Sequence, residues 1–228
     1  MAWRSSGASN QALIENLAAN GLITQPRVKQ AMLAVDRAHY APRNPYQDSP
    51  QPLGHRATIS APHMHAAALE SLLPYLHPGA KVLDIGSGSG YLTHVLAELV
   101  KPGGRVVGVE HIQALVEMGR VNVGKSAEGR GLLEMGVVGF VKGDGRVGVE
   151  EEEGGKGWDA IHVGAAAVKG GEGRLVGLLK APGRLFIPVE EEDYAQHIYV
   201  IDKVADGSVT RKKDMGVQYV PLTDAPTE

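Results

Sequence analysis

The sequence predicts an α/β fold built on a doubly wound, mostly parallel sheet, with helical additions before it and antiparallel strands after it. From Lys81 onward, short runs of Val, Leu and Ile alternate with helical stretches, which is the pattern of parallel βαβ units. Residues 1–78 instead combine helical periodicity with a proline-rich stretch. The last three apolar runs have no helix between them, which favours antiparallel strands on one edge of the sheet.

Two helices are expected near the N-terminus. Apolar residues recur at helical spacing between positions 12 and 18, and Asn20-Gly21 supplies a stop. Thr24 with Pro26 can start a second helix that continues to Val35.

The segment 40–52 holds four prolines, which exclude regular helix and central strand. Its position in the sequence is compatible both with a surface loop and with the wall of a binding cleft.

Beyond this segment, strands and helices alternate. We assign no element to the glycine-rich stretch 124–136, and we expect the Gly- and Glu-rich clusters at 150–157 and 190–193 to be solvated loops. Strands are expected at 82–85, 106–109, 137–141, 160–163 and 185–189, helices at 91–100, 111–123 and 175–179, and antiparallel edge strands at 198–204, 209–212 and 217–220.

Composition excludes several classes of protein. The net charge is −3, with Lys and Arg scattered along the chain, so no basic surface for nucleic acid is expected. The chain has no cysteine, which excludes disulfides, thiolate nucleophiles and Cys-based zinc sites. The N-terminus lacks the apolar region of a signal peptide and no apolar run reaches membrane-spanning length. We therefore expect a cytoplasmic protein with no membrane partner.

Residues 82–90, Val-Leu-Asp-Ile-Gly-Ser-Gly-Ser-Gly, join a strand to a helix through a glycine loop. Glycines let the backbone turn sharply and approach a ligand closely, although such a turn can also be merely structural. The spacing is not the dinucleotide pattern G-x-G-x-x-G, and Asp84 precedes the first glycine by two residues. An acid there would repel a pyrophosphate but attract a cationic ligand. S-adenosylmethionine carries a sulfonium and an ammonium and no phosphate.

Two further acids end the next two expected strands. Glu110 lies twenty residues after Gly90 and can accept hydrogen bonds from ribose hydroxyls. Asp144 could meet the exocyclic amine of an adenine. Each acid alone could be an ordinary turn residue, but three in succession behind one glycine loop predict S-adenosylmethionine as cofactor.

The stretch Ala57-Thr58-Ile59-Ser60-Ala61-Pro62-His63-Met64-His65-Ala66 closely resembles the signature that precedes the catalytic domain in protein-L-isoaspartate (D-aspartate) O-methyltransferases. The resemblance spans nearly the whole chain. It also covers 1–3, 36–40, 44–50, 82–90, 143–146, 159–167 and 215–224. The chain departs from the family pattern outside these motifs, at 124–136, 168–173, 180–183 and 188–193, and Glu110 occupies a position that is often Asp.

The resemblance implies a single domain over 1–228 with the Rossmann-like methyltransferase sheet. Residues 1–78 would form part of the substrate cleft, 79–190 the cofactor-binding core and 191–228 the C-terminal strands. Ser60 matches the active-site serine of the family, and Thr223 matches a residue that closes over the site. The cofactor-binding positions expected are Ala57, Thr58, Ile59, Ser60, His65, Asp84, Ile85, Gly86, Ser87, Gly88, Gly90, Glu110, His111, Gly143, Asp144, Gly145 and Thr223; the substrate-binding positions expected are Thr58, Ile59, Ser60, Val220 and Thr223.

The implied reaction esterifies the free carboxyl of L-isoaspartyl residues and, more weakly, D-aspartyl residues in damaged proteins and peptides. A carboxylate is already ionised at neutral pH, since its unperturbed pKa is about 4. No general base and no metal are therefore expected. A neutral hydroxyl such as Ser60 could hold one carboxylate oxygen while the other attacks. We expect a monomer.

Other interpretations stay open at this point. Ser60 could be the N-cap of a helix that begins at Pro62, His63 and His65 could be structural residues of its first turn, and Thr223 an ordinary turn residue. The whole chain could be a nicotinamide dehydrogenase, a nucleic-acid or small-molecule methyltransferase, or an inactive module that binds S-adenosylmethionine without transferring the methyl group.

Overall fold

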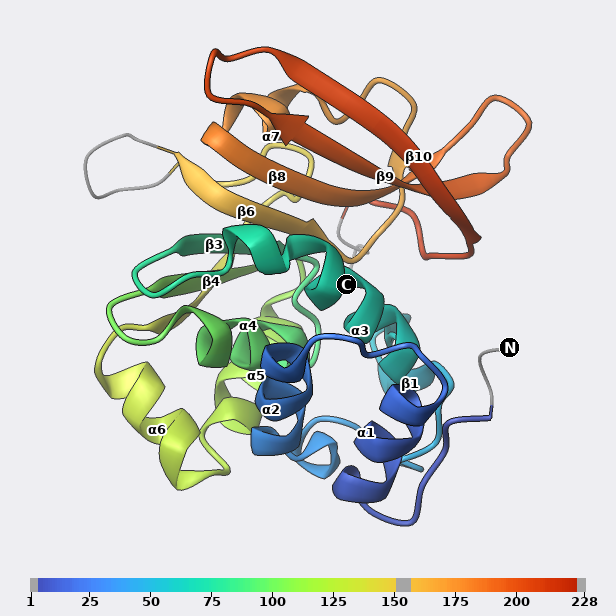
Figure 1. Cartoon of the computed structure of the whole chain (residues 1–228), viewed down its shortest axis with the longest axis vertical. Coiled ribbons are helices and arrows are strands. Elements are labelled where there is room, and N and C mark those ends of the chain that lie inside the picture. The colour runs from blue at the N-terminus through green and yellow to red at the C-terminus, as the bar shows by residue number, and fades with distance from the viewer. Residues whose placement is uncertain (1–3, 151–156, 225–228) are drawn as a thin grey trace.

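The computed structural model describes residues 4–150 and 157–224. These residues form an eight-stranded sheet with helices packed against it, and a separate two-stranded hairpin (Figure 1). Along the sheet the strand order is β10-β9-β8-β6-β3-β4-β5, and the short β7 pairs with β8. The strands are β3 (Lys81–Ile85), β4 (Arg105–Glu110), β5 (Val138–Lys142), β6 (Trp158–Val163), β7 (Ala167–Val168), β8 (Leu179–Glu190), β9 (Gln196–Lys203) and β10 (Val209–Val217).

The sheet is parallel from β5 to β8 and antiparallel from β8 through β9 to β10. This confirms the predicted fold class, including the antiparallel edge. The chain order reverses between β3 and β6, because β4 and β5 extend the sheet on one side of β3 and the later strands extend it on the other. Ligands of open α/β sheets bind at such a switch point, beyond the carboxyl ends of the strands.

The side chains of the sheet alternate between two hydrophobic clusters, one on each face. Val82 and Val106 belong to a cluster that also holds residues of most of the helices. Leu83 and Val107 belong to the other, which includes Leu175 of the short helix α7. The helices are α1 (Asn10–Ala19), α2 (Pro26–Ala34), α3 (Pro62–Leu72), α4 (Tyr91–Val100), α5 (Gln113–Val123), α6 (Ala127–Glu134) and α7 (Gly173–Gly177).

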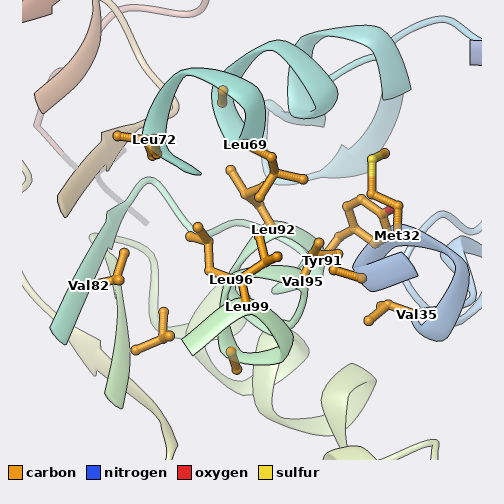
Figure 2. Packing of buried hydrophobic residues seen from close by; sticks show 14 of the residues in the cluster. Met32, Val35, Leu69, Leu72, Val82, Tyr91, Leu92, Val95, Leu96 and Leu99 are labelled. Atoms are coloured by element: carbon orange, nitrogen blue, oxygen red, sulfur yellow. The ribbon is translucent and has the colours of Figure 1, made fainter. Parts of the chain in front are cut away.

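The N-terminal helices are attached to the sheet through α4. Met32 of α2, Leu69 and Leu72 of α3 and Leu92 of α4 meet in one interior, beside Val82 of β3 (Figure 2). All five side chains are at most 4% exposed. This packing holds the start of α3, where the segment 57–66 ends, near the glycine loop that begins α4.

Several local predictions need correction. Gln25, not Thr24, precedes α2 as its N-cap, because the backbone and side chain of Thr24 donate instead to Glu70 of α3. The predicted edge strands 209–212 and 217–220 are not two strands, since β10 runs from Val209 to Val217 with a bulge and the chain then leaves the sheet. Residues 150–157 lie mostly outside the described residues.

Helix α6 lies in the stretch 124–136, to which the sequence assigned no element. Its glycines have low helix propensity, but Ser126 caps it by accepting a hydrogen bond from the Gly129 amide at 2.9 Å. A β-carbon at Gly129 would lie 2.0 Å from the Val123 carbonyl, so the close approach of α6 to α5 requires a glycine there.

The proline-rich segment contains neither regular helix nor central strand, as predicted. It ends in the separate hairpin of β1 (Gln51–Gly54) and β2 (Ala57–Ile59), and the short 3-10 helix η1 (Arg37–His39) precedes it. Asp48 and Ser49 are buried, so the segment is more than a surface loop. A second 3-10 helix, η2 (Leu73–Tyr75), follows α3.

Candidate active site

The glycine loop predicted at 86–90 turns from β3 into α4 at the switch point. Gly86 has a φ of +74° and its amide donates to the carbonyl of Val109 at the end of β4, 2.8 Å away. Gly90 has a φ of +82°, and a β-carbon there would lie 3.0 Å from Gly119 of α5 and Phe140 of β5. The loop therefore favours glycine for two different reasons, the left-handed backbone at Gly86 and, at Gly90, the close packing of α4 on α5.

A cavity of about 430 Å³ opens beyond the carboxyl ends of β3, β4 and β5. This volume lies in the range of pockets that hold small organic ligands. The lining residues come from β2 and its turn, the glycine loop, the ends of β4, β5 and β6, and the C-terminal segment: His55, Arg56, Ala57, Thr58, Gly86, Gly88, Val109, Glu110, His111, Ile112, Leu115, Gly143, Gly145, Gly164, Ala165, Val220, Pro221, Leu222, Thr223 and Asp224.

Glu110 is held at the wall of this cavity. Its Oε1 accepts from the amides of His111 and Ile112, at 2.8 and 3.2 Å, and its Oε2 accepts from the amide of Gly88 at 3.2 Å. The side chain is 5% exposed. A carboxylate fixed in this way keeps lone pairs for the hydroxyls of a bound ribose.

A second, smaller cavity of about 30 Å³ adjoins the first. Thr58, Gly86, Gly88 and Gly164 line both cavities, so the two are separated only by shared walls. The small cavity is lined in addition by Ile59, Ser60, His65, Asp84, Ser87, Ser89, Leu92 and His162.

Asp84 is 1% exposed at the end of β3. Its Oδ1 accepts from Nδ1 of His162 at 2.8 Å and its Oδ2 from the hydroxyl of Thr93 at 2.6 Å. Nearby, the hydroxyl of Ser87 is buried without a hydrogen-bond partner among the described residues. An acid with a free hydroxyl donor beside it suits a ligand that carries both an ammonium and a carboxylate, as the amino-acid part of S-adenosylmethionine does.

Ser60 does not cap α3. The N-cap of that helix is Ala61 and no side chain caps it, so the capping interpretation of Ser60 is wrong. The Ser60 hydroxyl instead acts on the phenol of Tyr219. Burial raises the pKa of the Tyr219 phenol to about 12, against the opposing effect of the Ser60 hydroxyl.

His65 lies behind Ser60 on α3 and is 7% exposed. Its Nδ1 lies 3.1 Å from Nη1 of Arg37, and Nη2 of Arg37 donates to the Ser60 carbonyl at 2.7 Å. Burial, followed by the charge of Arg37, holds the pKa of His65 well below its usual value.

The C-terminal segment covers one side of the large cavity. Ala166 donates to the carbonyl of Val220 at 2.8 Å and accepts from the amide of Leu222 at 2.7 Å, which places Thr223 at the cavity. Next to it, Arg146 pairs with both Asp144 and Asp224. This arrangement explains why the run 217–220 is not a strand of the main sheet.

Three of the predicted site residues do not line either cavity. Ile85 is fully buried in the core, because alternate residues of β3 face opposite sides of the sheet. Gly90 packs on α5. Asp144 is paired with Arg146 and lines a shallow groove beside the large cavity instead of the cavity itself. The remaining predicted positions all line one cavity or both.

Sequence reasoning missed His162, Gly164, Tyr219 and Arg37. The first two follow from strand order, since β6 pairs with β3 and Asp84 lies opposite His162. His162, Tyr219 and Arg37 are polar or charged residues inside the segments that carried the family resemblance. Their place in those segments was the signal that could have identified them as site residues. In the residues that the structure describes, no three His, Asp or Glu side chains gather into a group that could hold a metal ion.

The family model and the sequence relatives that match this chain carry the same description. Residues 8–227 match the family model described as protein-L-isoaspartate (D-aspartate) O-methyltransferase. The chain is 48% identical to the protein-L-isoaspartate O-methyltransferase of Caenorhabditis elegans, over 98% of this chain and 96% of the relative. It is also 48% identical to the Triticum aestivum protein of that name, over 94% and 91% of the two chains.

A solved structure agrees with the sequence relatives. A candidate protein-L-isoaspartate O-methyltransferase from Plasmodium falciparum, in complex with S-adenosyl-L-homocysteine, superposes with a TM-score of 0.84. The two share 36% identity, over 95% of this chain and 99% of the other. The chain therefore belongs to the protein-L-isoaspartate (D-aspartate) O-methyltransferase family.

Proposed function

We propose that this protein transfers a methyl group from S-adenosylmethionine to the free carboxyl of L-isoaspartyl residues in damaged proteins and peptides, and more weakly to D-aspartyl residues. One observation carries the proposal. The cavity with the acid suited to a ribose, Glu110, shares walls with the smaller cavity that contains Ser60 and His65. A nucleoside in the first would lie beside the smaller cavity, where Ser60 would face an incoming carboxylate, with Thr58, Gly86, Gly88 and Gly164 forming the shared walls.

The reaction needs no general base, because the attacking carboxylate is already ionised at neutral pH. When bound, S-adenosylmethionine supplies a methyl group on a sulfonium leaving group, so that the C–O bond forms as the C–S bond breaks. The residues of the chain must therefore hold the carboxylate in line and exclude water, and good orientation can contribute roughly 7–11 kcal/mol. Ser60 donates a neutral hydrogen bond, which orients an oxygen without stabilising the ionised substrate too strongly.

The acids of the site would hold the cofactor through different parts. Glu110 would accept from the ribose hydroxyls, and Asp84 would face the positive charges of the amino-acid part. The glycines at 86, 88, 143, 145 and 164 leave the walls free of side chains, so that a planar nucleoside can approach the backbone.

The target must be recognised mainly through its backbone, because isoaspartyl residues arise in flexible Asn-Gly and Asp-Gly segments of many sequences. Spontaneous loss of the methyl group through a succinimide returns some normal aspartate, which makes the reaction a repair. We further propose that the enzyme works as a monomer in the cytoplasm. A chain without cysteine gains no disulfide from an oxidising compartment, which supports the proposed location. None of the helices in the described parts of the chain is long and apolar enough to cross a bilayer.

The deciding experiment uses methyl-labelled S-adenosylmethionine and two peptides that differ only in carrying isoaspartate or normal aspartate. We expect base-labile label on the isoaspartyl peptide alone. Calorimetry with S-adenosylhomocysteine runs in parallel. Binding without transfer would make the protein an inactive cofactor-binding module, and binding of NADH in preference to S-adenosylhomocysteine would make it a dehydrogenase.

A further inference from the structure

Arg37 is a fully buried cation placed behind the small cavity. It lies in η1 and is 0% exposed. Within the described residues no carboxylate forms an ion pair with it, and its Nε has no hydrogen-bond partner. Burial lowers the pKa of Arg37 to about 10, against the opposing effects of Tyr91 and Asp48. Burying such a charge is unfavourable, and an apolar side chain of similar length would avoid this loss.

The guanidinium makes its polar contacts with the active site instead. Nη2 donates to the backbone carbonyl of Ser60 at 2.7 Å and Nη1 contacts Nδ1 of His65 at 3.1 Å. The Cζ atom of Arg37 lies 5.1 Å from the centre of the Tyr91 ring. This contact with the ring face helps to fix the plane of the guanidinium. One rigid group therefore sets the relative position of Ser60 and His65.

The contact also determines where His65 carries its proton. A guanidinium has only donors, so Nδ1 of His65 must accept, and the proton of the neutral ring lies on Nε2. No described residue accepts a hydrogen bond from Nε2, and the ring lines the small cavity with Ser60, Asp84 and His162. The titratable groups around the ring are Arg37 from η1, Tyr91 from α4, His162 from β6 and His63 from its own helix.

We propose that Arg37 is a positioning residue for methyl transfer, which holds His65 as a neutral Nε2–H donor beside the Ser60 hydroxyl so that both can orient the attacking carboxylate. This rests on the proposed function. A neutral donor leaves the attacking oxygen more reactive than a cationic histidine would, because an ion pair would stabilise the carboxylate before its charge is lost in the transition state. Arg37 thus allows His65 to donate a hydrogen bond to the carboxylate and prevents it from becoming protonated and forming an ion pair with it.

The first test observes the proton directly. Nitrogen-15 NMR of the histidine rings in the wild-type protein should show His65 with a protonated Nε2 and an unprotonated Nδ1, without titration between about pH 5 and 8. In Arg37→Met the ring should lose this fixed tautomer. Wild-type His65 with its proton on Nδ1, or one that becomes doubly protonated in this range, would overturn the proposal.

The second test measures turnover. Arg37→Lys retains a charge but cannot span both acceptors, so we expect kcat on an isoaspartyl peptide to fall about tenfold or more, with S-adenosylhomocysteine affinity within about twofold. Arg184→Lys is the matched control, since Arg184 also donates to a backbone carbonyl, that of Ser71, and lies over a tyrosine ring, but far from His65. It should lower the melting temperature and leave kcat unchanged.

A double-mutant cycle separates positioning from general stability. If Arg37 acts through His65, the loss in kcat from Arg37→Lys should largely disappear in a His65→Gln background. Additive losses with an active wild type would overturn the role of Arg37 and leave the proposed function intact. A wild type that binds S-adenosylhomocysteine but methylates no isoaspartyl peptide would instead overturn the proposed function, while the NMR experiment would still report the tautomer.

Discussion

Asp84 and His162 lie opposite each other on the neighbouring parallel strands β3 and β6, and Nδ1 of His162 donates to Oδ1 of Asp84 at 2.8 Å. The His162 ring stacks on Phe186 of β8, which holds it from the other side. Together with the hydroxyl of Thr93, this fixes both oxygens of the acid at the edge of the cavity.

Asp84→Asn should therefore weaken cofactor binding. The substitution removes a negative charge that faces a cationic ligand, and a hydrogen bond to a charged group contributes about 1.5–3 kcal/mol, so we expect at least tenfold lower affinity for S-adenosylhomocysteine by calorimetry. Asp159→Asn is the control, because Asp159 is also nearly buried on β6 but pairs with Lys180 outside both cavities. Equal affinity of Asp84→Asn and wild type would remove Asp84 from the cofactor site.

Glu110→Gln should weaken binding through the ribose. We expect a loss of about 1–3 kcal/mol, since an amide has one acceptor oxygen where the carboxylate has two. The sharper measurement repeats the calorimetry with an adenosylhomocysteine analogue that lacks both ribose hydroxyls, for which the variant and the wild type should bind alike. An equal loss with both ligands would mean that Glu110 acts only by holding the Gly88 and His111 amides.

Ser60→Ala should lower methyl transfer and leave cofactor affinity nearly intact. The hydroxyl lines the small cavity and not the large one, and loss of one oriented donor should reduce kcat roughly tenfold to a hundredfold. The control Ser126→Ala removes the cap of α6 and should cost about 1 kcal/mol of stability without affecting turnover. Unchanged turnover by Ser60→Ala would exclude the serine from a direct role.

Two glycines of the same backbone conformation should differ in their tolerance of alanine. Gly136 has a φ of +70° and open space around its missing β-carbon, so Gly136→Ala should cost about 1–2 kcal/mol for the left-handed backbone alone. Gly90→Ala should cost a further 1–3 kcal/mol or so, because its β-carbon would press on Gly119 and Phe140. Denaturant unfolding of both variants would measure the difference, and equal losses would contradict the packing of α4 on α5 described here.

His94 should make the protein sensitive to acid. Burial lowers the pKa of His94 to about 4, and its Nδ1 is within hydrogen-bond distance of the Tyr40 hydroxyl. Because the unfolded state takes up a proton near its ordinary pKa of about 6.5 and the folded state does not, this contribution to stability is complete above that value and is lost as the pH falls toward 4. Its size is up to about 3 kcal/mol. His94→Asn should flatten the stability profile between these pH values, and an unchanged profile would refute the assignment.

Much of the fold could be predicted because its signals are local. The apolar runs that became β3 to β6 and the glycines that begin α4 lie within a few residues of one another, and α4 has the predicted bounds. Helix α6 could not be predicted in this way, since its glycines oppose helix formation; packing on α5 explains Gly129, whereas nothing in the structure requires a glycine at Gly131.

The sequence by itself determined the type of sheet, the family and most of the residues around the cofactor cavity, because each follows from short contiguous patterns such as 57–66 and 82–90. Only the tertiary structure decided which side chains meet at the point of reaction. His162 reaches Asp84 across 78 positions and Arg37 reaches His65 across 28, through the strand order and the packing of η1 behind α3. The physical reason is that contacts between residues far apart in the sequence depend on how the whole chain folds, and a local sequence pattern does not determine that.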